Sequence, residues 1–214
     1  MRFCVNLFNL DYTTTLVEPD YDLLAADLAA AEALNTDLIA VIMHWGAEYL
    51  DGPTVHQKKV ADFMIAHGAD LLLGGHPHVL EPYTTITVED ESGAEHTGFV
   101  CYSLGNLISA QNQEKTETTA ILRLTLHKDL LTNETTLKDV DYVPCYMLDR
   151  EEGCAGKRYY LLDTHAAMKA YEDGNRELIT DGVYAALEKS LNHAHNIMGQ
   201  EGDWYLRSVE ENEG

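Results

Sequence analysis

The first half of the chain carries two kinds of hydrophobic pattern: continuous apolar runs, and an apolar stripe at helical spacing. The continuous apolar runs Asp37–Met43 and Asp70–Leu73 are typical of strands buried on both faces of a parallel sheet. The stretch between them carries an apolar stripe at helical spacing, with Val60, Phe63 and Met64 on one face. Together with two further segments, these runs predict a β-α-β-α-β order over residues 3–7, 21–34, 37–43, 53–68 and 70–73.

Short polar and turn residues punctuate the two predicted helices. Asp20 stands where the N-cap of the first helix is expected, and Pro53 suits the first turn of the second. Gly68 suits the end of that second helix. These signals fix where the chain passes from strand to helix and back.

The second half of the chain first predicts antiparallel strands and then helices. Tyr83–Glu89 and Thr97–Tyr102 flank a Ser-Gly turn and predict a hairpin. Ala120–His127 alternates apolar and polar residues, and we expect it to pair with Thr136–Val143 across a turn near Asn133.

From Asp163 onward the pattern predicts helices. We expect Thr164 to cap a helix over 166–171, followed by a long amphipathic helix over 178–198. The pattern predicts an α/β domain over residues 1–150 and a C-terminal helical extension over 151–214.

Composition narrows the classes of partner. The 214 residues carry 36 acidic and 14 basic side chains, a formal net charge of −22. Such a chain is a poor candidate for binding nucleic acid or an anionic membrane surface, because both favour basic patches. No apolar stretch approaches the ~18 residues of a membrane span, and the N-terminus lacks a signal-peptide layout. The four cysteines are far apart, so we expect no disulfide framework.

Histidines follow two of the predicted parallel strands at the point where each strand ends. His44 follows the first of these strands, and His76 and His78 follow the next in Gly74-Gly75-His76-Pro77-His78. Because ligands of open α/β sheets bind outside the carboxyl ends of the strands, we expect these side chains to converge. Neutral imidazole is a common ligand of divalent first-row metals, so the cluster predicts a metal site.

The two-residue spacing of His76 and His78 predicts a backbone conformation for this segment. Residues two apart in an extended chain point the same way, and Pro77 biases His76 away from the α region. We therefore expect an extended His76-Pro77-His78 segment. Trp45 and Tyr49 suit packing or the wall of a site better than chemistry.

The remaining histidines show no partner pattern, except that His67 lies on an apolar helix stripe and suits the core. His193 and His195 are two apart on a predicted helix, where side chains diverge, so we do not expect them to act together. The others without a pattern are His56, His96, His127 and His165.

The order of these motifs resembles the bacterial capsule-synthesis CapA family of poly-γ-glutamate capsule proteins. The resemblance covers roughly residues 1–150 and rests on His44-Trp45-Gly46, Glu48-Tyr49, Pro53, Gln57, Gly68-Ala69-Asp70, Gly74 to Leu80, Tyr102 to Asn106 and Asp141 to Pro144. It implies a calcineurin-type metallophosphoesterase-like α/β sandwich with a two-metal site.

The same resemblance implies roles for individual residues. His44, His76 and His78 stand where that fold has metal ligands, and His44 or Glu48 stands where a proton could be shuttled. It also implies substrate-contacting or supporting roles, carried by Trp45, Tyr49, Ser103 and Asn106.

The chain departs from the family pattern before residue 44. The family's strand-end Gly-Asp and its Asn-Asn-His motif are both absent there, so we expect a chain that matches the C-terminal part of the family domain. Without a bridging carboxylate, three histidines and water favour one divalent metal (Mn, Zn or Fe) over a complete pair.

Three hypotheses follow from different classes. The first is a metal-dependent, phosphoesterase-like hydrolase of capsule biosynthesis, placed by the resemblance outside the cell or in its envelope. The second is a non-catalytic component that binds poly-γ-glutamate or capsule-assembly proteins. The third is an inactive half-domain, whose uncovered sheet would favour self-association.

Overall fold

The computed structural model describes residues 3–9, 19–150 and 158–213, and the side chains of 19–150 and 158–208. The chain divides into two compact units. The first comprises Met1–Pro77, Glu81–Ser103 and His127–Thr136, and the second comprises His78–Leu80, Leu104–Leu126 and Leu137–Gly214. Each unit is described by itself below.

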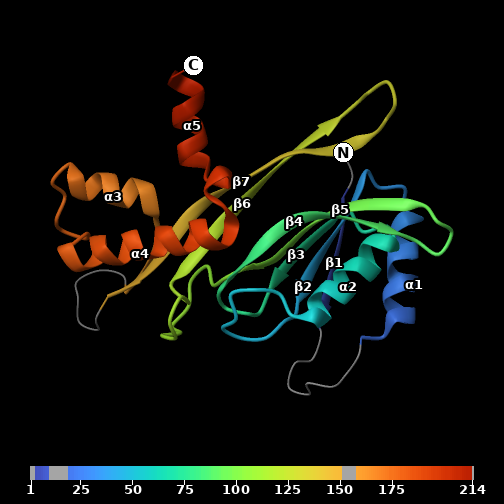
Figure 1. Cartoon of the computed structure of the whole chain (residues 1–214), viewed down its shortest axis with the longest axis horizontal. Coiled ribbons are helices and arrows are strands. Elements are labelled where there is room, and N and C mark those ends of the chain that lie inside the picture. The colour runs from blue at the N-terminus through green and yellow to red at the C-terminus, as the bar shows by residue number, and fades with distance from the viewer. Residues whose placement is uncertain (1–2, 10–18, 151–157, 214) are drawn as a thin grey trace. The chain divides into compact units, whose positions relative to one another are not determined.

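The first unit is built on a five-stranded sheet in the order β1-β2-β3-β5-β4. Strands β1, β2 and β3 run parallel, and β5 runs parallel to β3. Two helices, α1 and α2, alternate with the first three strands (Figure 1), which confirms the predicted β-α-β-α-β order and the α/β class. The elements are β1 (Phe3–Asn9), α1 (Tyr21–Glu32), β2 (Leu38–His44), α2 (Val55–Ala66), β3 (Leu71–Gly75), β4 (Leu80–Glu89) and β5 (Glu95–Leu104).

A single buried cluster joins both helices to the sheet. Alternate residues of β2 point into it, because successive side chains of a strand face opposite sides. They meet Leu28 of α1 and Val60 of α2, both essentially inaccessible to solvent. The β2 residues in the cluster are Ile39, Val41 and Met43. This packing holds the carboxyl ends of β2 and β3 in fixed register.

The start of α2 differs from the prediction by two residues. Thr54, not Pro53, precedes the helix as its N-cap, and its hydroxyl accepts a hydrogen bond from the backbone N–H of Gln57. The Gln57 side chain returns the contact to the backbone N–H of Thr54 at 2.8 Å, completing a capping box. Pro53 lies just outside the helix. Asp20 caps α1 and Gly68 follows the end of α2 at φ +92°, both as predicted.

The second unit contains a three-stranded sheet and the C-terminal helices. The sheet has the order β6-β7-β8, so the predicted pairing of the first two strands is confirmed. Its elements are β6 (Thr118–Lys128), β7 (Thr135–Asp149), β8 (Tyr159–Asp163), α3 (Thr164–Glu172), α4 (Asp181–Met198), the short 3-10 helix η1 (Gln200–Gly202) and α5 (Trp204–Glu213).

The C-terminal region contains helices, as predicted, but three details differ from the expectation. The region holds a strand, β8, which pairs antiparallel with the end of β7, because its Tyr-Tyr-Leu-Leu sequence suits a half-buried pleated surface. Asp163, not Thr164, caps α3, and its carboxylate accepts the backbone N–H of Ala166 at 3.0 Å. The long helix α4 begins at Asp181 after the N-cap Thr180, three residues later than predicted.

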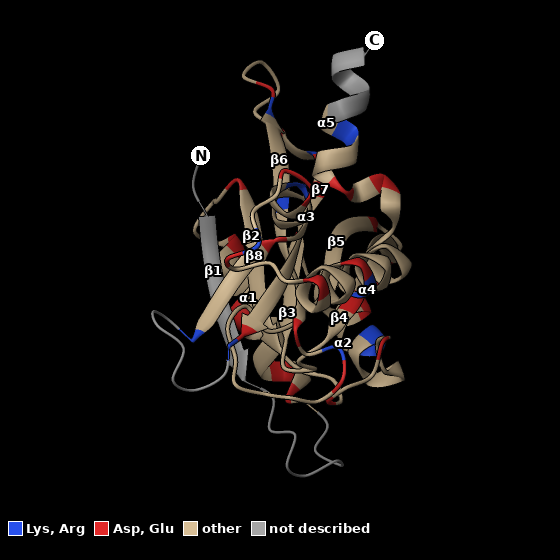
Figure 2. Ribbon diagram, turned by 90° about the vertical axis from the view of Figure 1, so that its left-hand side faces the viewer, with Lys and Arg blue, Asp and Glu red and all other residues tan. Residues whose placement is uncertain are grey.

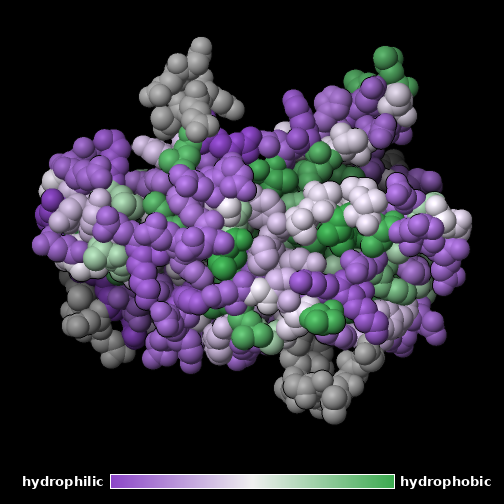
Figure 3. Space-filling model, viewed as in Figure 1, coloured by the Kyte–Doolittle hydropathy of each residue, from purple (hydrophilic) through white to green (hydrophobic). Residues whose placement is uncertain are grey.

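The surface reflects the acidic composition. Figure 2 shows acidic residues spread over many helices and loops. Figure 3 shows a largely hydrophilic face with scattered apolar patches, and among the described side chains Leu130 and Leu131 of the β6–β7 turn are 86% and 97% exposed. None of the helices within the described residues is both long and apolar enough to cross a bilayer. Cys101 and Cys145 are buried free thiols.

Candidate functional site

The carboxyl ends of β2 and β3 lie side by side, as the sequence predicted. His44 is the last residue of β2 and pairs in register with Gly75, the last residue of β3. His76 follows immediately after Gly75. The two imidazole rings come together, with centroids 4.6 Å apart.

A carboxylate reaches the same place from the loop after β2. Glu48 is exposed, and its carboxylate and a ring nitrogen of His76 lie within 4.8 Å of each other. The neighbouring Tyr49 has its pKa raised above the usual value, first by partial burial and then by the Glu48 carboxylate, to which its hydroxyl donates a hydrogen bond. Within the first unit, His76 therefore has two polar neighbours, the His44 ring and the Glu48 carboxylate, and Tyr49 contacts Glu48.

Trp45, the residue directly after His44, is buried in the first unit. Its side chain is fully buried, and its indole N–H donates to the carbonyl of Tyr102 at 2.9 Å. The ring also stacks on Tyr102, with centroids 5.7 Å apart. A Cβ at Gly74 would overlap the Tyr102 carbonyl and the Trp45 indole nitrogen, so only glycine fits this position. Trp45 therefore packs in the core of the first unit.

The backbone of the histidine loop is not extended. His76 has φ +99° and His78 has φ +63°, in a bend between β3 and β4. Pro77 does keep His76 out of the right-handed α region, but the expectation of an extended segment was wrong. Tyr49 also has a positive φ of +64°, and its backbone N–H donates to the carbonyl of Pro77 at 2.8 Å. Non-glycine residues held at positive φ cost about 1–3 kcal/mol each and concentrate at functional sites.

His78 belongs to the second unit, where it pairs with Asn106. Its Nδ1 lies 3.0 Å from the Asn106 side-chain oxygen, and the Asn106 amide nitrogen donates to Gln111 at 2.7 Å. Since an amide oxygen only accepts, this arrangement needs the proton of a neutral imidazole on Nδ1 and places its unprotonated nitrogen at Nε2. Asn106 therefore orients His78. Ser103 is fully buried in β5.

A buried pair beneath the loops was not singled out from the sequence. Glu81, the second residue of β4, is fully buried and accepts a hydrogen bond from the Gln57 amide at 2.7 Å. Burial raises its pKa to about 7, although the Gln57 hydrogen bond acts in the opposite direction. The Gln57 amide also fills the space beside Gly46, where a Cβ would lie 2.6 Å from Nε2. The signal in the sequence was a lone carboxylate directly after the apolar pair Val79-Leu80.

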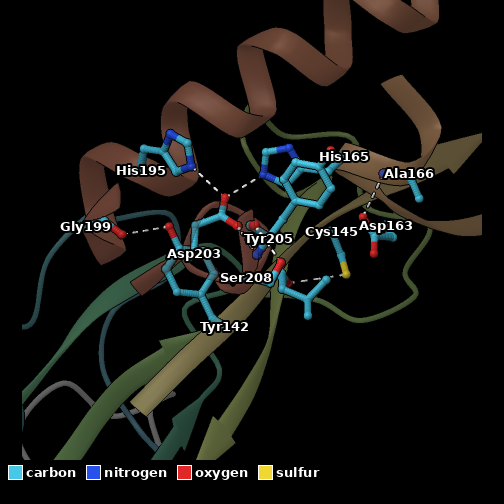
Figure 4. A network of polar contacts seen from close by, with 11 residues as sticks. Tyr142, Cys145, Asp163, His165, Ala166, His195, Gly199, Asp203, Tyr205 and Ser208 are labelled. Atoms are coloured by element: carbon cyan, nitrogen blue, oxygen red, sulfur yellow. Dashed lines mark hydrogen bonds and ion pairs between the residues drawn. The ribbon is translucent and has the colours of Figure 1, made fainter. Parts of the chain in front are cut away.

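Two histidines of the C-terminal region also have a partner that the sequence did not reveal. His165 and His195 both contact the carboxylate of Asp203, with Nε2 to Oδ2 distances of 2.6 and 2.8 Å (Figure 4). The expectation that these histidines lack partners was wrong, because residues 30 and 38 positions apart meet only after α3, α4 and η1 have packed. His193, two residues before His195, is not in this cluster, as helical geometry predicted.

Two donor types that suit a divalent metal meet at the ends of β2 and β3. Imidazole nitrogen and carboxylate oxygen are ligands of Zn²⁺, Mn²⁺ and Fe²⁺, and His76 and Glu48 offer one of each within 4.8 Å. The His44 ring, beside that of His76, adds a second imidazole to this end of the sheet.

Comparison with known proteins finds similarity to bacterial capsule-synthesis proteins. A family model described as bacterial capsule synthesis protein PGA_cap matches residues 6–111. A capsule biosynthesis protein CapA of Bacillus anthracis is 31% identical over 164 residues, which cover 76% of this chain and 36% of that relative. The PGA biosynthesis protein CapA of Bacillus subtilis (strain 168) is 36% identical over 95 residues, or 44% of this chain and 23% of the relative. The chain thus spans about a third or less of the length of these relatives.

Proposed function

The chain belongs, over residues 6–111, to the bacterial capsule synthesis protein family, and from that premise we propose that it carries a metal-dependent hydrolytic site for capsule biosynthesis. The ligands in this proposal are His44 and His76, with Glu48 as the proton acceptor. The observation that carries it is the gathering of His44, Glu48 and His76 at the carboxyl ends of two adjacent parallel strands.

A bound divalent cation would lower the pKa of a water molecule and polarise a phosphoryl or acyl oxygen. The chain's own residues prepare the site for that chemistry. The Tyr49 hydroxyl donates a hydrogen bond to the Glu48 carboxylate and holds it in place. An exposed carboxylate beside the imidazoles is placed to accept a proton from water.

Backbone strain supports a site rather than a plain turn. Tyr49, His76 and His78 are three of the six non-glycine residues with positive φ in the described parts of the chain. A turn without a function would meet the same backbone need with glycine, which bears no steric cost at positive φ.

We further propose poly-γ-glutamate as the polymer on which the site acts. A polyanion is repelled by a chain of net charge −22, so a cation between the two would be needed for close approach. The alternative of a non-catalytic, polymer-binding component differs on this point: its binding would survive a chelator.

The test is hydrolysis by the full chain after metal removal and reconstitution with Mn²⁺, Zn²⁺ or Fe²⁺. A chromogenic phosphodiester, bis(p-nitrophenyl) phosphate, serves as the probe. We expect metal-dependent turnover that falls at least about 100-fold in His76→Ala, the scale of a lost catalytic group. The matched control is His127→Ala, which removes an exposed histidine of β6. Equal rates in both variants, or no turnover with any of the three metals, would contradict a hydrolytic site.

A further inference from the structure

The C-terminal cluster of His165, His195 and Asp203 lies outside the residues that match the family model. Its members come from three elements: His165 from the first turn of α3, His195 from the last turn of α4, and Asp203 from the segment between η1 and α5. One ligand atom from each lies within 4.8 Å of the other two. Figure 4 shows both imidazoles directed at the same carboxylate.

The carboxylate is held as an anion. Asp203 is fully buried, its Oδ2 accepts from both imidazoles, and its Oδ1 accepts the backbone N–H of Tyr205 at 2.9 Å. Burial alone would raise the pKa of Asp203, but the hydrogen bonds from the two histidines outweigh it and hold the pKa below its ordinary value. An ionised, buried carboxylate is a strong ligand for a cation.

The surroundings fix the three donors in place. The His165 ring stacks on Tyr205, with centroids 4.5 Å apart and planes 14° from parallel. Tyr142 of β7 forms a backbone bridge with Asp203, and its hydroxyl donates to the carbonyl of Gly199 at 2.9 Å. Gly199, at φ +83°, turns the chain between His195 and Asp203. The imidazoles are only 12% and 16% exposed, so the cluster is largely shielded from solvent.

We propose that His165, His195 and Asp203 form a second metal site, which takes a divalent first-row transition metal of the Zn²⁺ type. Two imidazoles and a carboxylate are a ligand set that Zn²⁺ accepts, with water completing the coordination.

The geometry needs only a small adjustment. The Nε2–Oδ2 distances of 2.6 and 2.8 Å are those of hydrogen bonds, and donors at about 2.0–2.1 Å from a tetrahedral metal are about 3.4 Å apart. An opening of less than about 1 Å, with each imidazole ligating through Nε2 as the neutral tautomer that carries its proton on Nδ1, would convert the hydrogen-bonded cluster into a metal site. The metal would clamp α3, α4 and the segment before α5 together.

The experiment uses the full chain carrying His44→Ala, His76→Ala and His78→Ala, which removes the other candidate histidine ligands, so its outcome does not depend on the proposed function. Metal is stripped with a chelator, and Co²⁺ is titrated as a visible-absorption probe, followed by displacement with Zn²⁺. We expect one equivalent to bind. His195→Gln, which keeps an N–H donor for Asp203 but cannot ligate well, is expected to weaken binding at least about 100-fold, more than loss of an outer-shell partner usually costs. His193→Ala, on the same helix, is the matched control and is expected to leave binding unchanged.

Equal affinity in the parent and in His195→Gln would overturn the proposal and leave a purely structural histidine–aspartate hydrogen-bond cluster. If His195→Gln does not fold, X-ray absorption of the Zn²⁺-loaded parent decides. Two imidazole nitrogens and a carboxylate oxygen around the zinc support the site, and thiolate or oxygen-only coordination overturns it.

Discussion

Glu81 offers a direct check on the electrostatics beneath the histidine loop. Its carboxylate is fully buried, Oε2 accepts one hydrogen bond from Gln57, and Oε1 has no hydrogen-bond partner among the described residues. Its pKa is about 7 in the folded chain against an ordinary value of 4.5. That difference corresponds to about 3 kcal/mol of stability lost on ionisation in the folded state.

The sign of the pH dependence follows from proton uptake. Between about pH 4.5 and about pH 7 the folded state keeps the proton that the unfolded state releases, so stability falls as pH rises. Below that window both states are protonated and no penalty applies. We expect Glu81→Gln, which is neutral at every pH, to gain about 2.5 kcal/mol relative to the natural chain between about pH 5 and about pH 8.

The assay is urea unfolding of both chains at the two pH values. A Trp204→Phe background leaves the buried Trp45 as the only tryptophan, so fluorescence reports on the first unit, which contains Glu81. Glu91→Gln, at an exposed turn position, is the control and is expected to show no such gap. A stability difference between Glu81→Gln and the natural chain that stays constant with pH would refute the reasoning, since it would mean that Glu81 ionises as it does in water.

Three further predictions test the loops around the site. Gly74→Ala should lower the free energy of unfolding in urea by about 3 kcal/mol or more, because its Cβ overlaps the Tyr102 carbonyl. Gly75→Ala has open space at its Cβ and should lower it by less than about 1 kcal/mol. Equal losses in the two variants would contradict the close packing at Gly74. His76→Gly should be more stable than His76→Ala by about 1–2 kcal/mol, because alanine must keep the positive φ, and equal stability would show that the strain is absent. Asn106→Ala should shift the His78 ring away from the Nδ1–H tautomer in ¹⁵N-edited NMR, because His78 loses the acceptor of its Nδ1 proton, and an unchanged tautomer would exclude that role.

The sequence predicted the elements whose signals are local. The apolar runs of β2 and β3 and the stripe of α2 were sufficient to predict the parallel order, and with it the meeting of His44 and His76. Errors arose where neighbouring signals compete. Pro53 led to a predicted start of α2 two residues too early, although Thr54 has the hydroxyl that an N-cap needs.

Features that depend on tertiary packing were not predictable in this way. The positive φ of His76 occurs where the loop after β2 contacts the loop after β3, through the hydrogen bond from the backbone N–H of Tyr49 to the carbonyl of Pro77. A His-Pro-His sequence does not by itself predict that conformation. The partner of His165 and His195 is a single aspartate, and helical periodicity says nothing about which carboxylate two separate helices will share.

The most direct test of the central claim is the metal stoichiometry of the full chain with and without the strand-end histidines. Metal content is measured after reconstitution, by equilibrium dialysis and elemental analysis, for the natural chain, for His76→Ala/His78→Ala and for His127→Ala. The account predicts that the double variant binds one equivalent less than the other two, whatever binds elsewhere in the chain. The same stoichiometry in all three chains would contradict a metal site at the carboxyl ends of β2 and β3.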